Sequence, residues 1–283
     1  MKILIIPVSY CYNNFQSSAS ERFRCNWLLP YLEDADKYDG SQNPENYDAI
    51  VYQKAHSDRM VEFTKKYKHK IQVFDTTDPE WMFKEDANIR EMSKNISFMT
   101  ASTADVADGL RENYGLPVHV ILDGHESTYY ERVKVHEDKK PVLVWFGYSA
   151  NFHRILPLIP IIEKYKLELV TICEAPVQYG KFVKWDLETV NDEILECDIV
   201  LNLPGYYKSN NKSTTAWFLG MPVVEKSSDL FRFMDYKTRI KESNYRHKFV
   251  TENYDVAESA VQLTNLINNH KTYETNKNEN SKS

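Results

Sequence analysis

Short apolar stretches rich in β-branched residues alternate along the chain with segments in which apolar residues recur every three or four positions. The first pattern predicts buried strands, and the second predicts amphipathic helices. Expected strands span 2–8, 49–53, 70–74, 97–100 and 118–122, followed by 142–146, 167–172, 198–202 and 221–224. Expected helices span 22–32, 58–67, 102–113, 187–196, 214–219 and 256–269.

Strands that alternate with helices indicate parallel sheets covered by helices on both faces. Two such series predict an α/β protein with two doubly wound, Rossmann-like domains. The polar segment 123–140 interrupts the alternation and is the expected linker. We therefore expect an N-terminal domain over 1–130 and a C-terminal domain over 141–270. Residues 271–283 are poor in apolar side chains and are expected to form a disordered tail.

Composition is ordinary for a globular protein, with 42% hydrophobic and 27% charged residues among 283. No apolar run approaches the roughly 20 residues that a membrane span needs. The first residues are too quickly polar for a signal peptide, and they fit a buried strand instead. The four cysteines lack metal-ligand spacing. We expect reduced thiols, no metal site and a cytoplasmic location.

The net charge of −6 disfavours a polyanionic partner, because proteins that bind nucleic acid usually present a basic face. The segment 65–70 (KKYKHK) is the one basic cluster in the sequence. Its simpler interpretation is the solvated end of a surface helix. The alternative, a basic patch for nucleic acid, stays open at this point.

The loop after the first strand of the second series has features of an anion-binding site. Gly147 permits a tight turn and a close backbone approach to a ligand. Ser149 or Asn151 can cap the following helix, whose first turn holds His153 and Arg154. Cations there oppose the helix dipole unless an anion lies between them, although a plain strand–turn–helix with a surface arginine also fits. The candidate residues are Gly147, Tyr148, Ser149, His153 and Arg154.

A second loop, 203–215, follows the expected strand 198–202 and leads into a helix that ends at Gly220. Lysines and hydroxyl groups at a helix start are the combination that a diphosphate requires. An ordinary capped helix is the alternative interpretation. The candidate residues are Lys208, Lys212, Ser213 and Thr214.

A third candidate segment is 180–186, which contains Lys184 and Trp185 and is expected to end a short strand. The indole and nearby backbone amides are suited to stacking on a nucleobase and binding its edge. A core tryptophan fits equally well.

Together these segments resemble glycosyltransferases of the GT-B type, in the broad GT4-like group. The resemblance runs in order along residues 1 to about 225. In the second half it rests on 144–147 (VWFG), Asn151, Leu156, 185–186 (WD), 197–201 (CDIVL), Lys212, 215–216 (TA) and 220–224 (GMPVV). In the first half it rests on 20–24 (SERFR), 73–78 (VFDTTD) and 121–124 (ILDG).

The resemblance implies two Rossmann-like domains that face each other across a cleft. It implies that the C-terminal domain binds a nucleotide-sugar donor and the N-terminal domain the acceptor. It also implies that the last helix crosses back to the first domain. No cofactor or metal is implied, because basic side chains and helix dipoles neutralise the leaving diphosphate. The implied activity is transfer of a hexose-like sugar, with the donor itself as substrate.

One departure from the family concerns two glutamates, eight residues apart, that bind the donor in many of its members. Tyr207 and Thr215 stand at the matching positions. A non-catalytic nucleotide-sugar binding protein with the same fold is therefore an alternative function.

Catalytic candidates follow the expected strands of the first half. Lys54 and His56, Asp75 and Asp78, and Ser102 all come at strand ends. An inverting transferase needs a carboxylate or histidine as base, whereas a retaining one relies mainly on positioning; the sequence is compatible with both. We select Asp75 as the base.

The loop 17–24 carries two arginines that point in different directions on a helix. From the resemblance, Arg24 rather than Arg22 is expected to face the cleft and bind a phosphate or an anionic acceptor. Two surface arginines on an ordinary helix are the alternative.

The acceptor is open between a saccharide and a modified DNA base, and the second would make the protein a DNA-directed glycosyltransferase. A Rossmann dehydrogenase is disfavoured, because no GxGxxG follows either first strand.

Overall fold

The computed structural model describes residues 1–12, 18–84, 86–203 and 205–280, with 274–280 described by their backbone alone. Ser17 and Pro204, which belong to two of the expected loops, lie outside these residues. The chain divides into two compact units. Unit 1 comprises Met1–His125, Tyr206–Ser209 and Tyr254–Ser283, and unit 2 comprises Glu126–Gly205 and Asn210–Asn253.

Unit 1 contains a six-stranded sheet with the order β2-β1-β3-β4-β5-β6, and every neighbouring pair is parallel. Parallel pairing places all carboxyl ends of the strands along one edge, where ligands bind in open α/β sheets. The strands are β1 (Ile3–Ile6), β2 (Ala35–Lys37), β3 (Ala49–Gln53), β4 (Ile71–Thr76), β5 (Phe98–Ala101) and β6 (Val118–Val120).

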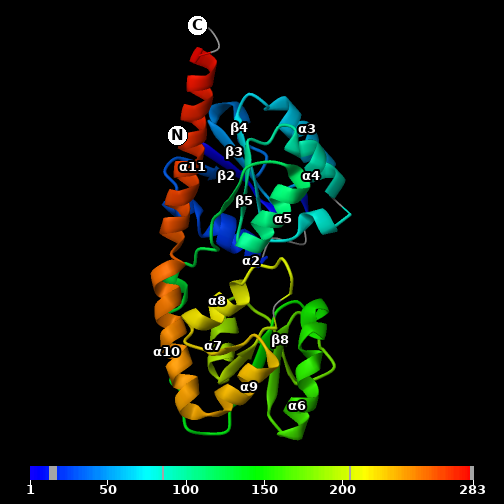
Figure 1. Ribbon diagram of the computed structural model, residues 1–283, viewed down its shortest axis with the longest axis vertical. Coiled ribbons are helices and arrows are strands. Elements are labelled where there is room, and N and C mark those ends of the chain that lie inside the picture. Colours follow the sequence, from blue (N-terminus) through cyan, green and yellow to red (C-terminus); the bar gives the residue numbers. More distant parts are fainter. Residues whose placement is uncertain (13–17, 85, 204, 281–283) are drawn as a thin grey trace. The chain divides into compact units, whose positions relative to one another are not determined.

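Both faces of this sheet are covered, because successive side chains of a strand point to opposite faces. Leu4 and Ile6 belong to a core formed with α3 (Asp58–Lys66), α4 (Asp86–Ser93) and α5 (Ala104–Tyr114). Ile3 and Ile5 pack on the other side with residues of α11 (Val256–Asn280). Figure 1 shows α11 running alongside the sheet of unit 1.

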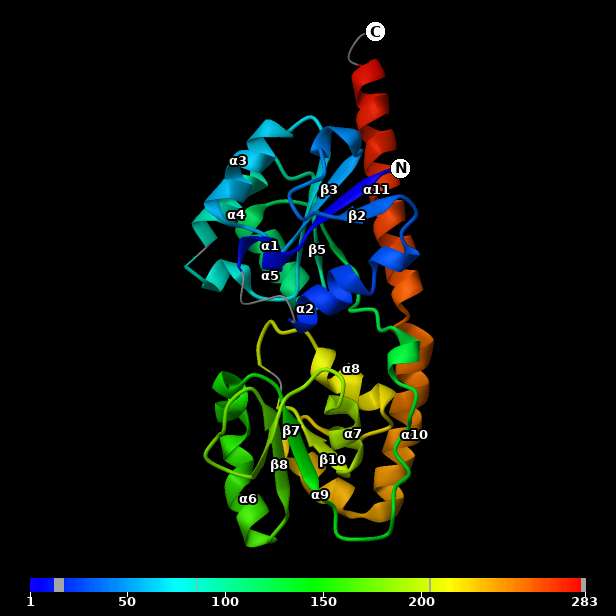
Figure 2. The same ribbon diagram turned by 180° about the vertical axis from the view of Figure 1, so that it is seen from behind.

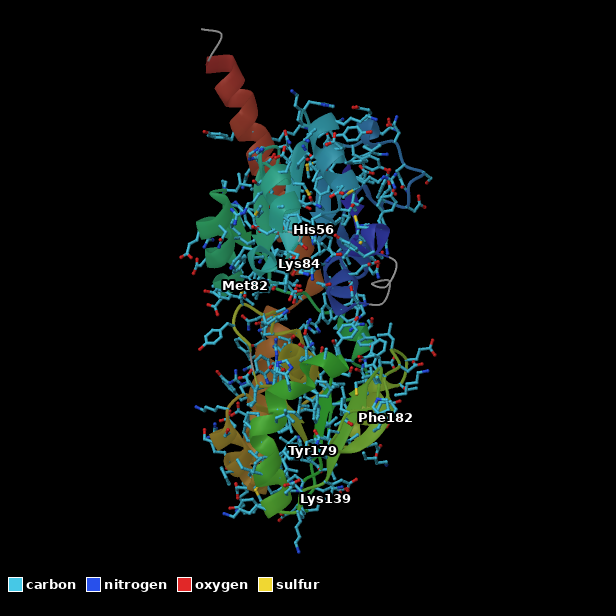
Figure 3. All side chains as sticks on the ribbon, turned by 90° about the vertical axis from the view of Figure 1, so that its right-hand side faces the viewer. His56, Met82, Lys84, Lys139, Tyr179 and Phe182 are labelled. Carbon is cyan, nitrogen blue, oxygen red and sulfur yellow. The ribbon has the colours of Figure 1, made fainter. Side chains whose placement is uncertain are left out.

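Unit 2 contains a five-stranded parallel sheet with the order β11-β10-β7-β8-β9. Its edge strand β9 carries Phe182, whose exposed fraction is 37% and which Figure 3 shows on the outer side of this unit. The strands are β7 (Leu143–Phe146), β8 (Leu169–Cys173), β9 (Lys181–Lys184), β10 (Ile199–Leu201) and β11 (Val223–Val224).

The core of unit 2 includes Leu143 and Trp145 of the central strand, together with side chains of η7, α6 and α9. Figure 2 shows α6, α9 and the long α10 around the sheet. The helical segments are the 3-10 helix η7 (Ser149–Leu158), α6 (Ile159–Lys164), α7 (Val190–Leu195), α8 (Asn211–Phe218), α9 (Ser227–Met234) and α10 (Tyr236–Asn253).

The segment 19–31, which covers most of the expected helix over 22–32, forms three short pieces instead. They are α2 (Ala19–Glu21), a π-helical turn (Arg22–Asn26) and a 3-10 turn (Leu29–Tyr31). Pro30 within the last piece has no N–H to donate and restricts the residue before it, so a continuous α-helix is unfavourable there. The sequence pattern also missed β2, whose three residues are too few and too polar to stand out.

The last helix is longer than its apolar pattern predicted. α11 continues through the segment that composition predicts to be disordered, as far as Asn280. Neither glycine nor proline occurs after Val256, so nothing in the sequence terminates the helix.

The prediction of an α/β protein with two Rossmann-like parallel sheets is confirmed. In the described part of the chain, no helix combines the length and apolar character of a membrane span. Cys11, Cys25, Cys173 and Cys197 are free thiols.

Candidate functional site

In unit 2, Gly147 and Lys212 meet at the carboxyl end of the central strand β7. Gly147 has φ of 141°, a conformation that favours glycine. The Lys212 ammonium lies so close that a Cβ at position 147 would collide with it. The same ammonium lies 5.0 Å from the centroid of the Trp145 ring. The two loops singled out in the sequence therefore bring a cation and a bare backbone together.

Arg154 lies against a second glycine, Gly205, which follows β10. A Cβ at position 205 would collide with its guanidinium group. Arg154 is half-buried and makes no ion pair with any residue that the structure describes. β7 and β10 are neighbouring parallel strands, so their carboxyl ends lie at the same edge of the sheet. Lys212 and Arg154 therefore both lie beside segments that follow strands at this edge.

The Ser149 donors, in contrast, are already used. The Ser149 amide and hydroxyl both donate to the carboxylate of Glu174, with the hydroxyl 2.5 Å from Oε1. Partial burial opposes ionisation, but the hydrogen bonds from Ser149 outweigh it and lower the pKa of Glu174. Glu174 thus occupies the two Ser149 donors at the start of η7.

The hydroxyl groups at the start of α8 bond within the unit. Ser213 is 1% exposed, accepts a hydrogen bond from Asn202 and donates one to Glu225, both over 2.9 Å. The Thr214 hydroxyl donates to the backbone carbonyl groups of Asn210 and Asn211. Both hydroxyls therefore shape the loop, and only local opening would present them to a ligand.

The remaining donor-site candidates of unit 2 lie near the surface. The Tyr148 side chain is 52% exposed, and His153 Nδ1 lies 2.8 Å from the Ala150 carbonyl oxygen. Lys184 ends the edge strand with its side chain exposed. Trp185 is half-buried, and its backbone amide donates to the Cys173 carbonyl.

Lys208 differs from the other lysine of its loop because its segment, Tyr206–Ser209, belongs to unit 1. Its ammonium group pairs with Asp78, which also pairs with Lys54. Burial opposes ionisation of Asp78, but the two lysines outweigh it and lower the pKa to about 2. The structure thus separates Lys208 and Lys212 into different sites.

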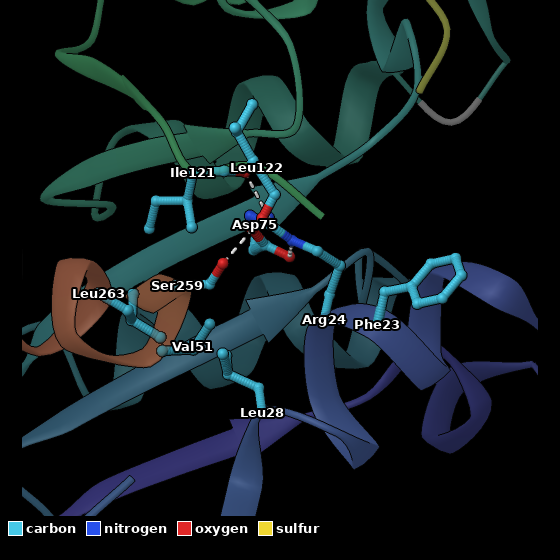
Figure 4. A pocket seen from close by; sticks show the side chains of 9 residues that line it. All are labelled: Phe23, Arg24, Leu28, Val51, Asp75, Ile121, Leu122, Ser259 and Leu263. Atoms are coloured by element: carbon cyan, nitrogen blue, oxygen red, sulfur yellow. Dashed lines mark hydrogen bonds and ion pairs between the residues drawn. The ribbon is translucent and has the colours of Figure 1, made fainter. Parts of the chain in front are cut away.

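In unit 1, Arg24 and Asp75, the two predicted catalytic residues, bind each other (Figure 4). Arg24 Nε donates to Asp75 over 3.2 Å, and a second guanidinium nitrogen binds the other carboxylate oxygen. Arg24 also donates to the carbonyl groups of Ile121 and Leu122, and the Thr100 hydroxyl donates to Asp75 over 2.6 Å.

Arg24 and Asp75 are 5% and 4% exposed. They line a cavity of about 10 Å³, enough for about one water molecule but not for a sugar. The expectation that Arg24 binds a phosphate or an anionic acceptor remains a prediction, and in this structure the guanidinium is buried against Asp75. The geometry favours a structural ion pair that ties the end of β4 to the π-helical turn.

Asp123 follows β6 beside the same arginine, with a carboxylate oxygen 3.7 Å from it. Its other oxygen accepts a hydrogen bond from Ser209. Burial raises the pKa of Asp123.

Sequence reasoning missed Asp123, Glu174 and Glu225. It also missed Glu80, which lies 3.7 Å from the Lys54 ammonium. Glu174 and Glu225 each come directly after a strand, as does Gly147. Selecting every polar residue that directly follows a strand would have identified both glutamates. No group of three or more His, Cys, Asp or Glu suited to a metal ion occurs among the residues that the structure describes.

No protein-family model matches the chain, and no curated protein matches it. Solved structures do match. HepE of Anabaena in complex with UDP has a TM-score of 0.69 at 13% identity, covering 95% of this chain and 100% of that one. A DNA-modifying β-glucosyltransferase has a TM-score of 0.62 at 11% identity, covering 94% and 99%. A glycosyltransferase from Rickettsia africae has a TM-score of 0.59 at 9% identity, covering 95% and 98%.

These likenesses extend over nearly the whole of each chain. The fold is therefore that of glycosyltransferases of the GT-B type, as the sequence predicts.

Proposed function

We propose that the protein is a glycosyltransferase that takes a sugar from a nucleotide-sugar donor. The observation that carries the proposal is the pair of cations in unit 2, Lys212 against Gly147 and Arg154 against Gly205. Each cation lies beside a glycine backbone at a strand end, where the charged oxygens of a diphosphate can approach closely. HepE, which has the same fold, was solved with UDP, and this supports a uridine diphosphate donor.

In this reaction the bond from the anomeric carbon to the diphosphate breaks, and negative charge develops on the leaving phosphate oxygen. Fixed cations at that oxygen stabilise the transition state more than the ground state. We propose that Lys212 and Arg154 have this role and that the reaction therefore needs neither metal nor cofactor. Retention of activity in EDTA is the corresponding expectation.

Of the remaining predicted donor residues, Gly147 is proposed to give the diphosphate access to the backbone. Tyr148, His153, Lys184 and Trp185 are near the surface of the same unit and are proposed to surround the nucleotide. Ser149, Ser213 and Thr214 are proposed to support the loops through the bonds described above. The acceptor is proposed to be a saccharide hydroxyl.

The test is isothermal titration with UDP, GDP and CDP, using the wild type, Arg154→Ala and Lys212→Ala. A charged hydrogen bond is worth about 1.5–3 kcal/mol, or roughly ten- to a hundredfold in affinity. We expect each variant to lose affinity by that factor. Lys248→Ala, which removes an exposed lysine of the same unit, is the control and should bind as the wild type does.

Wild-type affinity in both variants would contradict the assignment of these two cations. Absence of nucleotide binding to the wild type would contradict the donor class itself. Slow release of nucleotide from UDP-glucose or UDP-N-acetylglucosamine separates an enzyme from a binding protein, because a pure binder leaves the donor intact.

Transfer to DNA is disfavoured by the net charge of −6. If the protein bound duplex DNA with an affinity that falls steeply as salt is added, DNA would become the favoured acceptor.

A further inference from the structure

A histidine lies between a carboxylate and a phenol at the carboxyl ends of the strands of unit 1. His56 Nδ1 is 3.3 Å from the Tyr12 hydroxyl, and its Nε2 is 3.7 Å from Oε2 of Glu80. His56 and Glu80 are 7% and 3% exposed, whereas Tyr12 is half-buried. Burial thus decreases from Glu80 through His56 to Tyr12. Figure 3 shows His56 among the side chains of this unit.

Three neighbouring strands bring these residues together. Tyr12 follows β1 and the short helix α1 (Val8–Cys11), His56 follows β3, and Glu80 follows β4. Because β1, β3 and β4 are adjacent and parallel, their carboxyl ends meet at one edge. Lys54 has φ of 52°, which turns the chain sharply after β3 and before His56.

Charged neighbours hold the carboxylate in place. Glu80 accepts a hydrogen bond of 2.8 Å from the Thr76 hydroxyl, and Lys54 Nζ lies 3.7 Å from the same oxygen. Lys54 also pairs with Asp78, which pairs in turn with Lys208. Burial raises the pKa of Glu80, and Lys54 opposes that rise.

A carboxylate, an imidazole and a hydroxyl in this order are the components with which enzymes activate a weak nucleophile. The carboxylate orients the ring and stabilises the imidazolium that forms when the other nitrogen accepts a proton. Contacts of this kind are often long before the substrate binds and tighten in the reacting complex. The pair Arg24–Asp75 lacks this arrangement, because the guanidinium already occupies both carboxylate oxygens.

We propose that Tyr12, His56 and Glu80 form a proton relay that activates the acceptor hydroxyl. The proposal rests on the proposed glycosyltransferase function. As the acceptor oxygen bonds to the anomeric carbon, the bond from that carbon to the diphosphate breaks. The acceptor proton passes to the Tyr12 oxygen, and the phenol proton passes to His56 Nδ1. The imidazolium is stabilised by Glu80, and the diphosphate leaves with the displaced electron pair.

A relay of this kind has a stereochemical consequence. A base that activates the acceptor for one direct displacement inverts the anomeric carbon. With UDP-α-glucose as donor and water as acceptor, the first sugar formed should therefore be β-glucose. Proton NMR recorded before mutarotation reads this outcome.

The test compares Tyr12→Phe, His56→Asn and Glu80→Gln with the wild type in hydrolysis of UDP-α-glucose and UDP-N-acetylglucosamine. General base catalysis contributes roughly 10²–10⁴-fold, so we expect kcat to fall at least about a hundredfold in the first two variants. His69→Asn, which changes an exposed histidine of the same unit, is the matched control and should keep its kcat. UDP affinity and melting temperature should be close to wild type in the relay variants.

Glu80 acts through His56 and is a positioning residue, so its variant needs a separate readout. Removing a negative charge near the imidazole makes the ring less basic. The acidic limb of the kcat–pH profile should move to lower pH in Glu80→Gln, and it should be absent in His56→Asn. Lys54, Asp78 and Lys208 remain in all variants, so their charges do not account for a difference.

Wild-type kcat in Tyr12→Phe or His56→Asn, or α-glucose as the first product, would overturn the relay while leaving the glycosyltransferase function intact. A melting temperature that falls with kcat in every relay variant would make the cluster structural and would equally overturn it. A wild-type protein that binds UDP but turns over neither donor would contradict the proposed function, and the relay with it.

Discussion

The buried ion pair of unit 1 offers a direct test of whether Arg24 and Asp75 support the fold or the chemistry. Asp75→Asn removes the carboxylate charge with little change of shape. It leaves a guanidinium that is 5% exposed with only carbonyl partners and the more distant Asp123. Breaking a buried pair costs about 3–5 kcal/mol, because the remaining charge is uncompensated. We expect the lower end of this range, since Asp123 is still nearby.

Arg24→Met should cost more than Asp75→Asn. Arg24 is the cation beside both Asp75 and Asp123. Its loss therefore leaves two buried carboxyl groups without their cationic partner. We expect the upper end of the same range. In the double variant Arg24→Met/Asp75→Asn the penalties overlap, because each single change already breaks the same interaction. The double variant should therefore lose less stability than the sum of the single variants, by at least about 1 kcal/mol.

Urea unfolding followed by tryptophan fluorescence measures these free energies. Asp108→Asn, which breaks an exposed ion pair with Arg111, is the control and should cost less than about 1 kcal/mol. Single variants within about 1 kcal/mol of wild type would refute the structural role. Asp75→Asn with unchanged stability and a turnover reduced a hundredfold would restore the carboxylate as the catalytic base.

Other changes separate space, conformation and charge. Gly147→Ala should weaken UDP binding, measured by titration, at least about tenfold, because the added methyl group collides with Lys212. Gly115 also has a positive φ, but the space around it is open. Gly115→Ala is therefore the control, and it should cost about 1 kcal/mol of stability and leave UDP binding unchanged. Gly109→Ala should lower the free energy of unfolding, measured in urea, by about 1–3 kcal/mol, because its Cβ would overlap the Trp81 ring. Wild-type stability of this variant would show that the ring moves freely. Burial lowers the pKa of His125 to about 3. As the pH falls below about 6.5, the unfolded chain therefore takes up the proton first, and the free energy of unfolding falls by up to about 1.4 kcal/mol per pH unit until pH 3. His125→Phe should flatten this pH dependence in urea titrations between about pH 6.5 and 4.

The alternation of apolar and polar positions predicted the fold because most strands are short, buried and bounded by polar turns. Residues 49–53 were predicted as a strand with the bounds that the structure has. The same reasoning failed where tertiary contacts decide the structure. Ala35–Lys37 is too polar to be recognised as a strand, and it forms the edge of the sheet by pairing with β1. Pro30 divided a helix whose apolar spacing was otherwise regular.

The candidate site was predictable as far as strand ends define it. Gly147, Arg154 and Lys212 all lie in the turn and helix segments that follow β7 and β10, the strands from which they were selected. Pairing between distant residues was not predictable. No feature of the sequence places Lys208 on Asp78, 130 positions away, or Arg24 on Asp75, 51 positions away. Those pairs decide which charges are already neutralised, and only the folded chain shows them.

The candidate donor-binding residues of unit 2 differ in whether their charges and donors already have a partner. Glu174 occupies the Ser149 amide and hydroxyl, so a phosphate there would have to displace a carboxylate. Arg154 makes no ion pair with a described residue, and binding an anion costs it no existing partner of that kind. Charged hydrogen bonds that replace an existing ion pair gain less than those formed anew, because only the difference between partners remains. We therefore expect Arg154 to contribute more to diphosphate affinity than Ser149, whose expected contribution is to hold the loop.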